Sequence, residues 1–547
     1  MVVKREAAAL PPWSADPAGR SDAPALGDLL VAAALRWPDR TAIDDGADSY
    51  TFAQLEHGAQ AIAARLTERG VGAGDRVAVL AQKRSFMPMI AVAIWKCGAV
   101  YVPLDATEPR ARLRNLLARL RPAAVITLDD RDPTTAGECR LGGEELAGIL
   151  SGPPTAHATV GHRPEDAAYI VFASGATGEP QGAEISVAGL TAHLRGQNEV
   201  LRLTAESRVL GLTPFHFDVS IEDTLLPLSL GAFVYQFRGL PAGAVIRSVV
   251  ARQGITHLIA TTMLLTMITG DGRQITEARL PSLELVMTGA QICDPETLRI
   301  WTRALPKARI VHAFGPPEAT IFSFTHEVGP READRMTTCP VGRPLRGTRA
   351  KIMRDGVELH RPGAQGELWV GGAQVMRGYF DQPGETARLV VDLDGTRYFR
   401  TGDICSYDTD GNVVLHRHAD ERITWLAGRR THLGEVTRAA LNCPGVDRAI
   451  AAVVLRNQRA VVALGVVSRE RRVVAEVAER LRGILPEYLR PALVAWSPAV
   501  PAASAAAPDE RLLVQRLTAA AQQTDSHYFA LSAEGAVETI DEVELCQ

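Results

Sequence analysis

Residues 169–182 place an apolar run directly before a loop of small and hydroxyl side chains. The run Tyr-Ile-Val-Phe-Ala is followed by Ser174, Gly175, Thr177 and Gly178. Glycines let the backbone approach an anion closely, and hydroxyls donate hydrogen bonds to phosphate oxygens. A Walker loop is excluded because the pattern GxxxxGK[ST] is absent. The segment therefore predicts a phosphate-binding loop after a strand, with a glycine-rich surface turn as the alternative.

Lysines, which often bind phosphate and carboxylate groups, are scarce in this chain. The 59 basic residues include only five lysines, at positions 4, 83, 96, 307 and 351. GC-rich codon usage is one interpretation of this excess of arginine over lysine. Any reaction that requires a lysine nevertheless has five candidates, and none of them follows residue 351.

The elements that position such a loop alternate between strand and helix. Short apolar strands are expected at 76–80, 123–127, 208–212, 256–260 and 283–287, separated by helices such as 52–66 and 86–97. This alternation is typical of an α/β protein with a mostly parallel sheet. The 547 residues suffice for two to four domains with a large core.

The composition changes twice in the second half of the chain. Between about 340 and 415, short β-rich segments separated by Gly, Pro and Asp suggest a small barrel-like sheet. Beyond 420 we expect strands at 448–455 and 460–467 and a helix at 469–484, which indicates an α+β unit. The expected organisation is a poorly ordered segment 1–25, a large domain 26–419, a small domain 420–523 and an acidic tail 524–547.

Several protein classes are excluded by composition. The net charge of -4 argues against a nucleic-acid binder. The seven cysteines form no CxxC pair, so neither a zinc site nor a disulfide framework is expected. The same cysteine pattern predicts a cytoplasmic location. No stretch has the length of a membrane span or the pattern of a secretory signal.

A series of further motifs accompanies the loop in a fixed order along the chain. The motifs are Ser49-Tyr-Thr-Phe-Ala-Gln-Leu55, Trp95-Lys-Cys-Gly-Ala-Val-Tyr-Val-Pro-Leu-Asp105, Phe217-Asp-Val-Ser220, Phe314-Gly-Pro-Pro-Glu318, Gly366-Glu-Leu-Trp-Val-Gly-Gly372 and Phe399-Arg-Thr-Gly-Asp403. In this order they resemble the adenylate-forming superfamily, specifically the amino-acid adenylation domains of nonribosomal peptide synthetases. The resemblance implies a large N-terminal domain of two α/β sheet subdomains plus a small β-barrel-like part, followed by a small mobile α+β C-terminal domain.

The resemblance implies a two-step reaction with ATP and Mg²⁺. A carboxylate attacks the α-phosphate of ATP to give an acyl-adenylate, and a phosphopantetheine thiol of a carrier protein then accepts the acyl group. By similarity, Glu318 would hold Mg²⁺ and act in catalysis, and Asp420 would be the hinge of the small domain. The ATP-binding residues would be Ser174, Gly175, Thr177, Gly178, Phe314, Asp403, Arg417 and His418.

The resemblance also maps a substrate pocket. Asp218 occupies the position that binds an α-ammonium group, which favours an α-amino acid. The pocket lining would comprise Val219, Glu222, Ile259, Met287, Gly289, Ala313, Ile321 and Phe322. A carboxylate in an apolar pocket is costly unless it is paired, so Glu222 suggests a basic or diamino acid substrate. The alternative is that Glu222 points elsewhere.

The chain departs from the family at catalytic positions. Gln181, Thr424 and Ala507 stand where lysines are expected, and Pro317 replaces a threonine. His418 stands where an arginine is usual, although Arg417 is adjacent, and His432 replaces a glutamate. Arg511 is the cation nearest to the lost lysine at 507, and guanidinium differs from ammonium in reach and geometry. Losing that lysine should reduce the rate by roughly 10²–10³.

Three functions remain open from the sequence. The first is a stand-alone adenylation protein of nonribosomal peptide, antibiotic or other secondary-metabolite biosynthesis, with impaired or altered catalysis, served by a separate carrier protein or other synthetase component. The second is a catalytically inactive homologue that acts as a binding or scaffold partner. A ligase that does not use a carrier thiol is a third hypothesis. Residues 525–535 faintly resemble the start of a carrier domain, with an unrelated acidic tail as the alternative.

Overall fold

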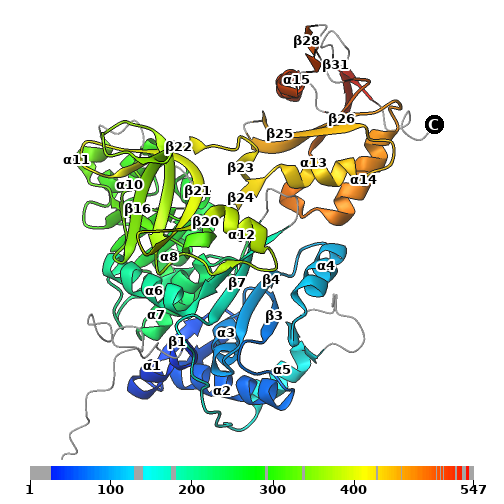
Figure 1. Ribbon diagram of the computed structural model, residues 1–547. Coiled ribbons are helices and arrows are strands. Elements are labelled where there is room, and N and C mark those ends of the chain that lie inside the picture. Colours follow the sequence, from blue (N-terminus) through cyan, green and yellow to red (C-terminus); the bar gives the residue numbers. More distant parts are fainter. Residues whose placement is uncertain are drawn as a thin grey trace, which may run out of the picture. The chain divides into compact units, whose positions relative to one another are not determined.

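The computed structural model describes residues 26–128, 139–173, 180–289, 293–334, 339–426, 429–457, 459–499, 502–504, 507–508, 510–523, 526–531 and 537–540. The described residues form two compact units (Figure 1). The N-terminal unit contains the described residues up to Ala106, together with those of Arg119–Val171 and Gly182–Ala419. The C-terminal unit contains Thr107–Ala118, the described part of Phe172–Gln181 and the described chain from Asp420 onward. The limits that the sequence suggests for the four segments stay predictions, and segment 1–25 lies outside the described residues.

Two largely parallel sheets form the centre of the N-terminal unit. The nine-stranded sheet has the order β15-β14-β13-β12-β11-β9-β10-β1-β2, and the seven-stranded sheet has the order β19-β8-β7-β4-β3-β5-β6. The strands of the first are Thr41–Asp44 (β1), Ser49–Thr51 (β2), Arg208–Gly211 (β9), Phe233–Gln236 (β10), His257–Thr261 (β11), Leu285–Gly289 (β12), Arg309–Phe314 (β13), Phe324–Glu327 (β14) and Arg343–Pro344 (β15). Those of the second are Arg76–Ala81 (β3), Val100–Asp105 (β4), Ala124–Thr127 (β5), Arg140–Leu141 (β6), Ala167–Ala173 (β7), Gln181–Ser186 (β8) and Gly378–Tyr379 (β19).

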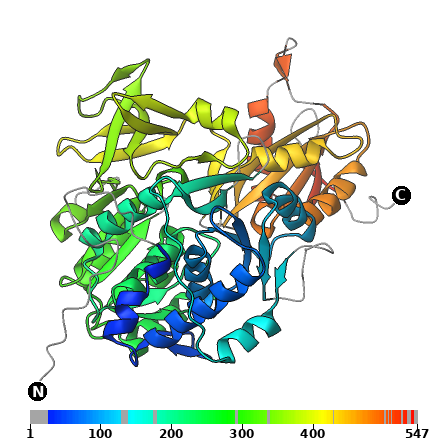
Figure 2. The same cartoon turned by 60° about the horizontal axis from the view of Figure 1, so that its bottom comes forward.

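Helices flank these sheets, as the alternating pattern predicts. They are Leu26–Asp28 (η1), Val31–Arg36 (α1), Phe52–Glu68 (α2), Met87–Lys96 (α3), Gly143–Ser151 (α5), Val187–Leu201 (α6), Ile221–Leu225 (η2), Leu226–Ser229 (α7), Gly243–Gln253 (α8), Thr262–Thr269 (α9), Pro295–Ala304 (α10), Pro317–Ala319 (η3), Pro330–Ala333 (α11) and Pro383–Leu389 (α12). Helix α2 begins at a capping box, in which the Thr51 side chain accepts from the Gln54 backbone and the Gln54 side chain accepts from the Thr51 backbone. Figures 1 and 2 show α2 and α3 side by side, and their apolar faces share one core with β3.

The β-rich segment after 340 forms a separate antiparallel sheet in the N-terminal unit. Its order is β17-β16-β18-β21-β20, and β22 also pairs with β21. The strands are Thr348–Arg354 (β16), Val357–Glu358 (β17), Gly366–Gly372 (β18), Val390–Leu393 (β20), Thr396–Tyr407 (β21) and Val413–His418 (β22). The sheet holds the two motifs that end at Gly372 and Asp403. The prediction of a mixed α/β chain with a small β-rich part is confirmed.

The C-terminal unit is built around the five-stranded sheet β25-β26-β27-β30-β31. Its elements are Arg110–Leu120 (α4, to residue 118), Ile423–Leu426 (β23), Arg429–His432 (β24), Gly434–Leu441 (α13), Arg448–Arg456 (β25), Arg459–Val467 (β26), Val473–Ile484 (α14), Glu487–Leu489 (η4), Leu493–Ser497 (β27), Ala502–Ser504 (β28), Ala507–Pro508 (β29), Glu510–Gln523 (α15), Tyr528–Leu531 (β30) and Val537–Thr539 (β31). The ion pair between Arg112 of α4 and Glu435 of α13 lies within this unit.

Alternation along β26 divides the C-terminal unit into two cores. Val462 and Leu464 pack with residues of α13 and α14, whereas Ala463 packs with residues of α15. Successive side chains of a strand point to opposite faces, so helices cover both faces of the sheet (Figure 1). No described helix is long and apolar enough to cross a membrane.

The end of the chain contributes to this sheet. Residues 528–531 form β30, which is parallel to β27 and antiparallel to β31. Phe529 and Leu531 are fully buried against α15. The segment expected as an acidic tail, with its faint carrier-like pattern, therefore supplies two strands of the C-terminal sheet.

Candidate functional site

The predicted pocket residues gather at the carboxyl ends of three neighbouring parallel strands. In the register of β11, β12 and β13, Thr261 lies beside Gly289 and Gly289 beside Ala313. The same apolar core contains Ile259, Met287, Ala313, Ile321 and Phe322, with Val219 packed against it. Ligands of open α/β sheets bind at such carboxyl edges.

Gly289 is required by this packing. A β-carbon at this position would lie 2.5 Å from the Ala313 carbonyl oxygen and 2.8 Å from the Phe322 ring. Both distances are shorter than a carbon atom tolerates, so glycine is the residue that lets the two strands and the ring meet here.

A strained loop follows β13. Thr320 and Ile321 have φ angles of 59° and 62°. For a β-branched residue such as isoleucine, a left-handed conformation is unfavourable, and residues of this kind concentrate at functional sites. The loop carries Glu318, the predicted metal ligand, and Ile321 and Phe322, which are predicted to line the pocket.

Gln374 holds this loop in place and was not predicted from the sequence. Its Nε2 donates to the Phe322 carbonyl at 3.0 Å, and its own carbonyl accepts from Thr320 Oγ1 at 2.6 Å. The Oε1 atom accepts from Thr348 Oγ1 at 2.6 Å, and Gln374 is 1% exposed. The only available signal was its place two residues after the motif that ends at Gly372.

Glu318 is buried and oriented by a tyrosine. The hydroxyl of Tyr379 donates to Glu318 Oε1 at 2.7 Å, and the Glu318 carbonyl accepts from the Met376 backbone at 2.8 Å. Phe314, four residues earlier, packs in the core of the antiparallel sheet, with its ring centroid 6.3 Å from that of Phe324. Among the described residues, no group of three or more His, Cys, Asp or Glu gathers as a metal site.

Asp218 is a buried carboxylate that pairs with no lysine or arginine of the described chain. It is 7% exposed, and burial raises its pKa from 3.8 to about 6, while His193 and the backbone N–H groups of Val219 and Ile321 partly oppose that rise. Within the described part of the chain, its Oδ2 atom has no hydrogen-bond partner and no lysine or arginine pairs with it. Buried charges in proteins are normally paired, so this carboxylate is suited to a ligand cation.

Glu222 also points into the protein interior. It lies on the π-helical turn η2 and is 0% exposed, and burial raises its pKa well above the ordinary value. Its Oε1 atom accepts from Gln197 Nε2 at 2.9 Å, and its Oε2 atom lies 3.4 Å from His193 Nε2. Gln197 Nε2 also lies 3.2 Å from the sulfur of the predicted pocket residue Met287. Single π-turns are frequent at functional sites.

Asp403 lies opposite His418 in the β21–β22 pair. Arg417 lies opposite Ile404, the next residue along β21. Adjacent strand residues point to opposite faces, so His418 rather than Arg417 shares the face of Asp403. His418 Nε2 lies 3.2 Å from the Thr401 carbonyl oxygen, whereas Arg417 is exposed.

The predicted hinge residue Asp420 begins the described C-terminal chain of the second unit. It pairs with Arg422 at 2.7 Å and with His432 Nε2 at 3.2 Å. These partners hold the pKa of Asp420 well below its usual range. His432, which stands where the sequence resemblance predicts a glutamate, thus contacts the predicted hinge residue directly.

The positions of the missing lysines are distributed over three elements. Gln181 begins β8, Thr424 lies in β23 opposite Thr431, and Ala507 begins β29. Arg511 lies on the first turn of α15 and is exposed. The phosphate-loop residues Ser174, Gly175, Thr177 and Gly178 lie outside the described residues.

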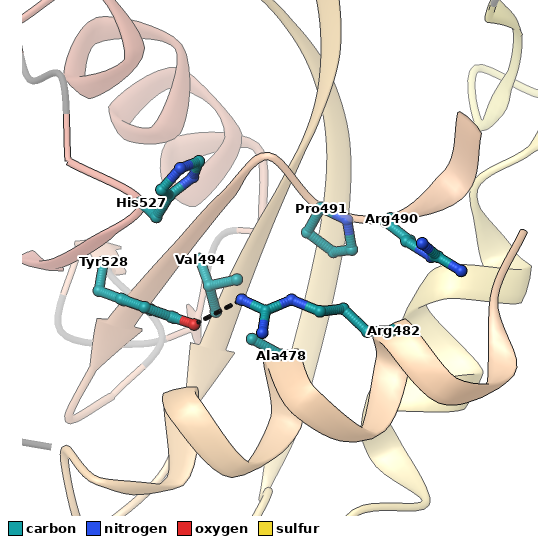
Figure 3. Close-up of a pocket in the computed structure, with 7 residues that line it drawn as sticks. All are labelled: Ala478, Arg482, Arg490, Pro491, Val494, His527 and Tyr528. Carbon is teal, nitrogen blue, oxygen red and sulfur yellow. Dashed lines mark hydrogen bonds between the residues drawn. The ribbon is translucent and has the colours of Figure 1, made fainter. Parts of the chain in front are cut away.

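A cavity of about 180 Å³ lies within the C-terminal unit (Figure 3). Arg482 Nη2 donates to the Tyr528 hydroxyl at 3.3 Å, and His527 Nδ1 donates to the Ala492 carbonyl at 2.8 Å. The lining residues are Ala478, Arg482, Arg490, Pro491, Val494, His527 and Tyr528. None of the predicted substrate or nucleotide residues lines this cavity.

Comparison with known proteins identifies the family. Residues 30–380 match the model of the family described as AMP-binding enzyme. The chain belongs to the AMP-binding enzymes. Within the adenylate-forming superfamily, its similarity is to the adenylation domains of nonribosomal peptide synthetases.

Two curated relatives and one solved structure illustrate the similarity. The chain is 31% identical over 484 residues to the probable non-canonical nonribosomal peptide synthetase CymA of Salinispora arenicola (strain CNS-205), covering 87% of this chain and 6% of the relative. It is 28% identical to novobiocin biosynthesis protein H of Streptomyces niveus, covering 78% of this chain and 71% of the relative.

The solved structure is NpsA-ThdA, an artificially fused adenylation–PCP di-domain from Klebsiella oxytoca. It matches with a TM-score of 0.77 at 21% identity, over 87% of this chain and 94% of that chain. At this identity the structure establishes the fold alone. The chain spans only a small part of CymA, so the activities of that whole protein are not transferred.

Proposed function

We propose that this AMP-binding family member forms an aminoacyl-adenylate from ATP and an α-amino acid, in the biosynthesis of a nonribosomal peptide or related metabolite. The observation that carries the proposal is Asp218. Its buried carboxylate has an unpartnered oxygen and no cation among the described residues. An α-ammonium group supplies the missing charge and donors, whereas a fatty or aryl acid does not.

The substrate's side chain is proposed to be basic. Glu222 is a second buried carboxylate without a lysine or arginine partner among the described residues, and it contacts the pocket through Gln197 and Met287. An ammonium or guanidinium on the substrate would balance its charge. An aliphatic side chain would leave the charge of an ionised Glu222 uncompensated.

The nucleotide would use the residues around β13 and β21. Asp403 would accept hydrogen bonds from the ribose hydroxyls, with His418 beside it, and Phe314 would contact the adenine. Mg²⁺ commonly takes one or two protein carboxylates together with substrate phosphates, and the buried, tyrosine-bound Glu318 fits that donor set. When bound, Mg²⁺ would offset the charge of the triphosphate.

In the proposed step a substrate carboxylate oxygen forms a bond to the α-phosphorus while the bond to the β-phosphate oxygen breaks and pyrophosphate leaves. The chain's contribution is to hold the ammonium at Asp218 and the ribose at Asp403, so that the two reactants meet in line. Gln181, Thr424 and Ala507 offer no cation where the family has lysines, so we infer slow chemistry. A phosphopantetheine thiol on a carrier protein is the proposed acceptor.

Amino-acid-dependent pyrophosphate release by the purified chain tests the proposal. Release that depends on one amino acid and disappears in Asp403→Ala and Asp218→Asn would support it. Amino-acid and ATP binding without release would instead support the catalytically inactive binding or scaffold protein. Absence of both binding and release would refute amino-acid adenylation.

A further inference from the structure

Tyr379 contacts the predicted metal ligand Glu318 from a distant part of the chain. Its hydroxyl donates a hydrogen bond to Glu318 Oε1 at 2.7 Å. The donor residue is 7% exposed and the acceptor residue 8%, so the bond is shielded from water. Hydrogen bonds from a hydroxyl to a carboxylate are among the stronger ones in proteins. The mapped site residues do not include Tyr379, and the proposed reaction gives it no role.

The backbone around Tyr379 is fixed on both sides. Residues Gly378–Tyr379 form β19, which is antiparallel to β8, with Tyr379 opposite Ala183. The Tyr379 N–H group donates to Thr386 Oγ1 of α12 at 2.8 Å. A β-carbon on Gly378 would lie 2.8 Å from Thr386 Cγ2, so glycine permits this close contact with α12. The tyrosine side chain therefore starts from a strand that is held by both a sheet and a helix.

The segment that carries Tyr379 also holds the backbone of Glu318. The Glu318 carbonyl oxygen accepts from the Met376 N–H group at 2.8 Å. At its other end, the segment donates from the Phe380 N–H group to the Gly182 carbonyl oxygen at 2.8 Å. Gly182 is the last residue of the predicted phosphate-binding segment. Residues 376–380 therefore connect the predicted metal ligand to the end of that segment and fix the direction of the Glu318 carboxylate.

The hydrogen bond to Oε1 limits how Glu318 can bind a cation. Because Tyr379 engages Oε1, a cation would bind through Oε2 alone. Mg²⁺ requires nearly ideal octahedral geometry, keeps several waters and takes one or two carboxylates. Ca²⁺ takes about 6–8 oxygen ligands in flexible geometry and often binds both oxygens of one carboxylate. A carboxylate restricted to one oxygen therefore favours Mg²⁺.

We propose that Tyr379 is a positioning residue that restricts Glu318 to binding through one oxygen, and that the nucleotide site thereby selects Mg²⁺ over Ca²⁺. The inference rests on the proposed adenylation, in which Glu318 is the metal ligand. Tyr379 acts through Glu318 and needs no contact with the nucleotide. Hydrogen bonds of this kind orient the residues that bind a metal, and their loss commonly costs about 10–100-fold in metal affinity.

Calorimetric titration of the full chain with ATP tests the inference. No amino acid is present, so binding is measured without a reaction. ATP is titrated with Mg²⁺, with Ca²⁺, and without metal in the presence of EDTA. Wild type should bind ATP more tightly with Mg²⁺ than with Ca²⁺. Tyr379→Phe keeps the ring and removes the hydroxyl, so it should weaken ATP binding with Mg²⁺ by about 10–100-fold and leave metal-free ATP binding unchanged. The preference for Mg²⁺ over Ca²⁺ should fall in the same variant.

The same exchange at another tyrosine is the control. Tyr235 lies on β10 outside the predicted site, and Tyr235→Phe should bind ATP like wild type. Equal affinity for ATP with Mg²⁺ in Tyr379→Phe and wild type would overturn the inference. An equal loss with and without metal would also overturn it, because that loss would not pass through the metal ligand. The same holds if wild type shows no preference for Mg²⁺.

Glu318→Gln separates this inference from the proposed function. The amide oxygen still accepts from Tyr379 but carries no charge, so the gain in ATP affinity on adding Mg²⁺ should be lost. If the preference for Mg²⁺ survives in this variant, Glu318 is not the metal ligand and only the inference fails, provided that wild type binds ATP and an amino acid. If wild type binds neither of them, the proposed function itself fails.

Discussion

Replacing Asp218 with asparagine should make the stability of the protein relative to wild type rise with pH, while abolishing amino-acid binding. The substitution keeps the shape of the side chain and removes its charge. Asparagine Oδ1 can still accept from the backbone N–H groups of Val219 and Ile321 that now face the carboxylate. Its Nδ2 group takes the place of the unpartnered Oδ2 atom.

The magnitude follows from the pKa of Asp218. Burial raises it from 3.8 to about 6. At about 1.4 kcal/mol per pH unit, ionisation in the folded state costs about 3 kcal/mol. The folded-state pKa is the higher one. The wild-type protein therefore has this stability of about 3 kcal/mol in full below pH 3.8, where the carboxyl is neutral in both states, and loses it as the pH rises through about 6.

The variant lacks this titration. Its free energy of unfolding relative to wild type should therefore rise by about 2–3 kcal/mol between about pH 4 and about pH 8. A buried amide without an acceptor costs about 1–3 kcal/mol at every pH, so the variant should be the less stable protein at the acid end. Burial also raises the pKa of Asp223 to about 6, but Asp223 titrates in both proteins. Its contribution therefore cancels in the stability difference between the variant and wild type.

Urea unfolding monitored by tryptophan fluorescence at several pH values measures the difference. Binding of the preferred amino acid is measured on the same preparations. A stability difference that is constant or falls with pH would refute the account of Asp218 as an unpaired buried charge. Wild-type amino-acid affinity in the variant would refute its role as the ammonium site.

Three further substitutions test other features. Gln374→Ala should reduce stability by about 1–3 kcal/mol and lower amino-acid-dependent activity, because the strained loop loses its support. Urea unfolding measures the stability and pyrophosphate release measures the activity. Unchanged values would contradict the support of this loop by Gln374. Phe529→Ala should destabilise the C-terminal unit by about 3–5 kcal/mol in calorimetric unfolding, since its ring is fully buried, and an unchanged transition would exclude β30 from that core. Ala507→Lys should raise pyrophosphate release by roughly 10²-fold relative to an Ala503→Lys control if the missing lysine limits the rate, and equal rates in the two variants would reject that cause.

The fold was predictable because its strands are short apolar runs between amphipathic helices. The helix expected at 86–97 is α3, Met87–Lys96, and the strand expected at 448–455 is β25, Arg448–Arg456. Periodicity and ordered motifs sufficed for these elements. The strand Tyr528–Leu531 was not expected, although four consecutive apolar residues have the length of a strand, because the surrounding residues are acidic and polar.

The site was predictable only where a motif marks it. Asp218, Glu222 and the residues at the ends of β11, β12 and β13 follow from motif positions, and the structure brings the pocket residues into one core. His193, Gln197 and Gln374 could not be found in this way. They lie on a helix or a loop outside the motifs, and only tertiary packing places them beside Glu222 and Phe322. The phosphate-loop assignment stays a prediction.

The short strand β31 has a consequence for how copies of this chain meet. Among the described residues it is the last strand in the order of the five-stranded sheet, and edge strands are a common starting point for aggregation. The sequence around it, residues 534–544, contains five acidic residues and no lysine or arginine. A segment with this excess of negative charge repels the same segment of another copy, and the repulsion opposes association of the copies. Added salt screens such repulsion, so the colloidal stability of concentrated solutions should fall as ionic strength rises.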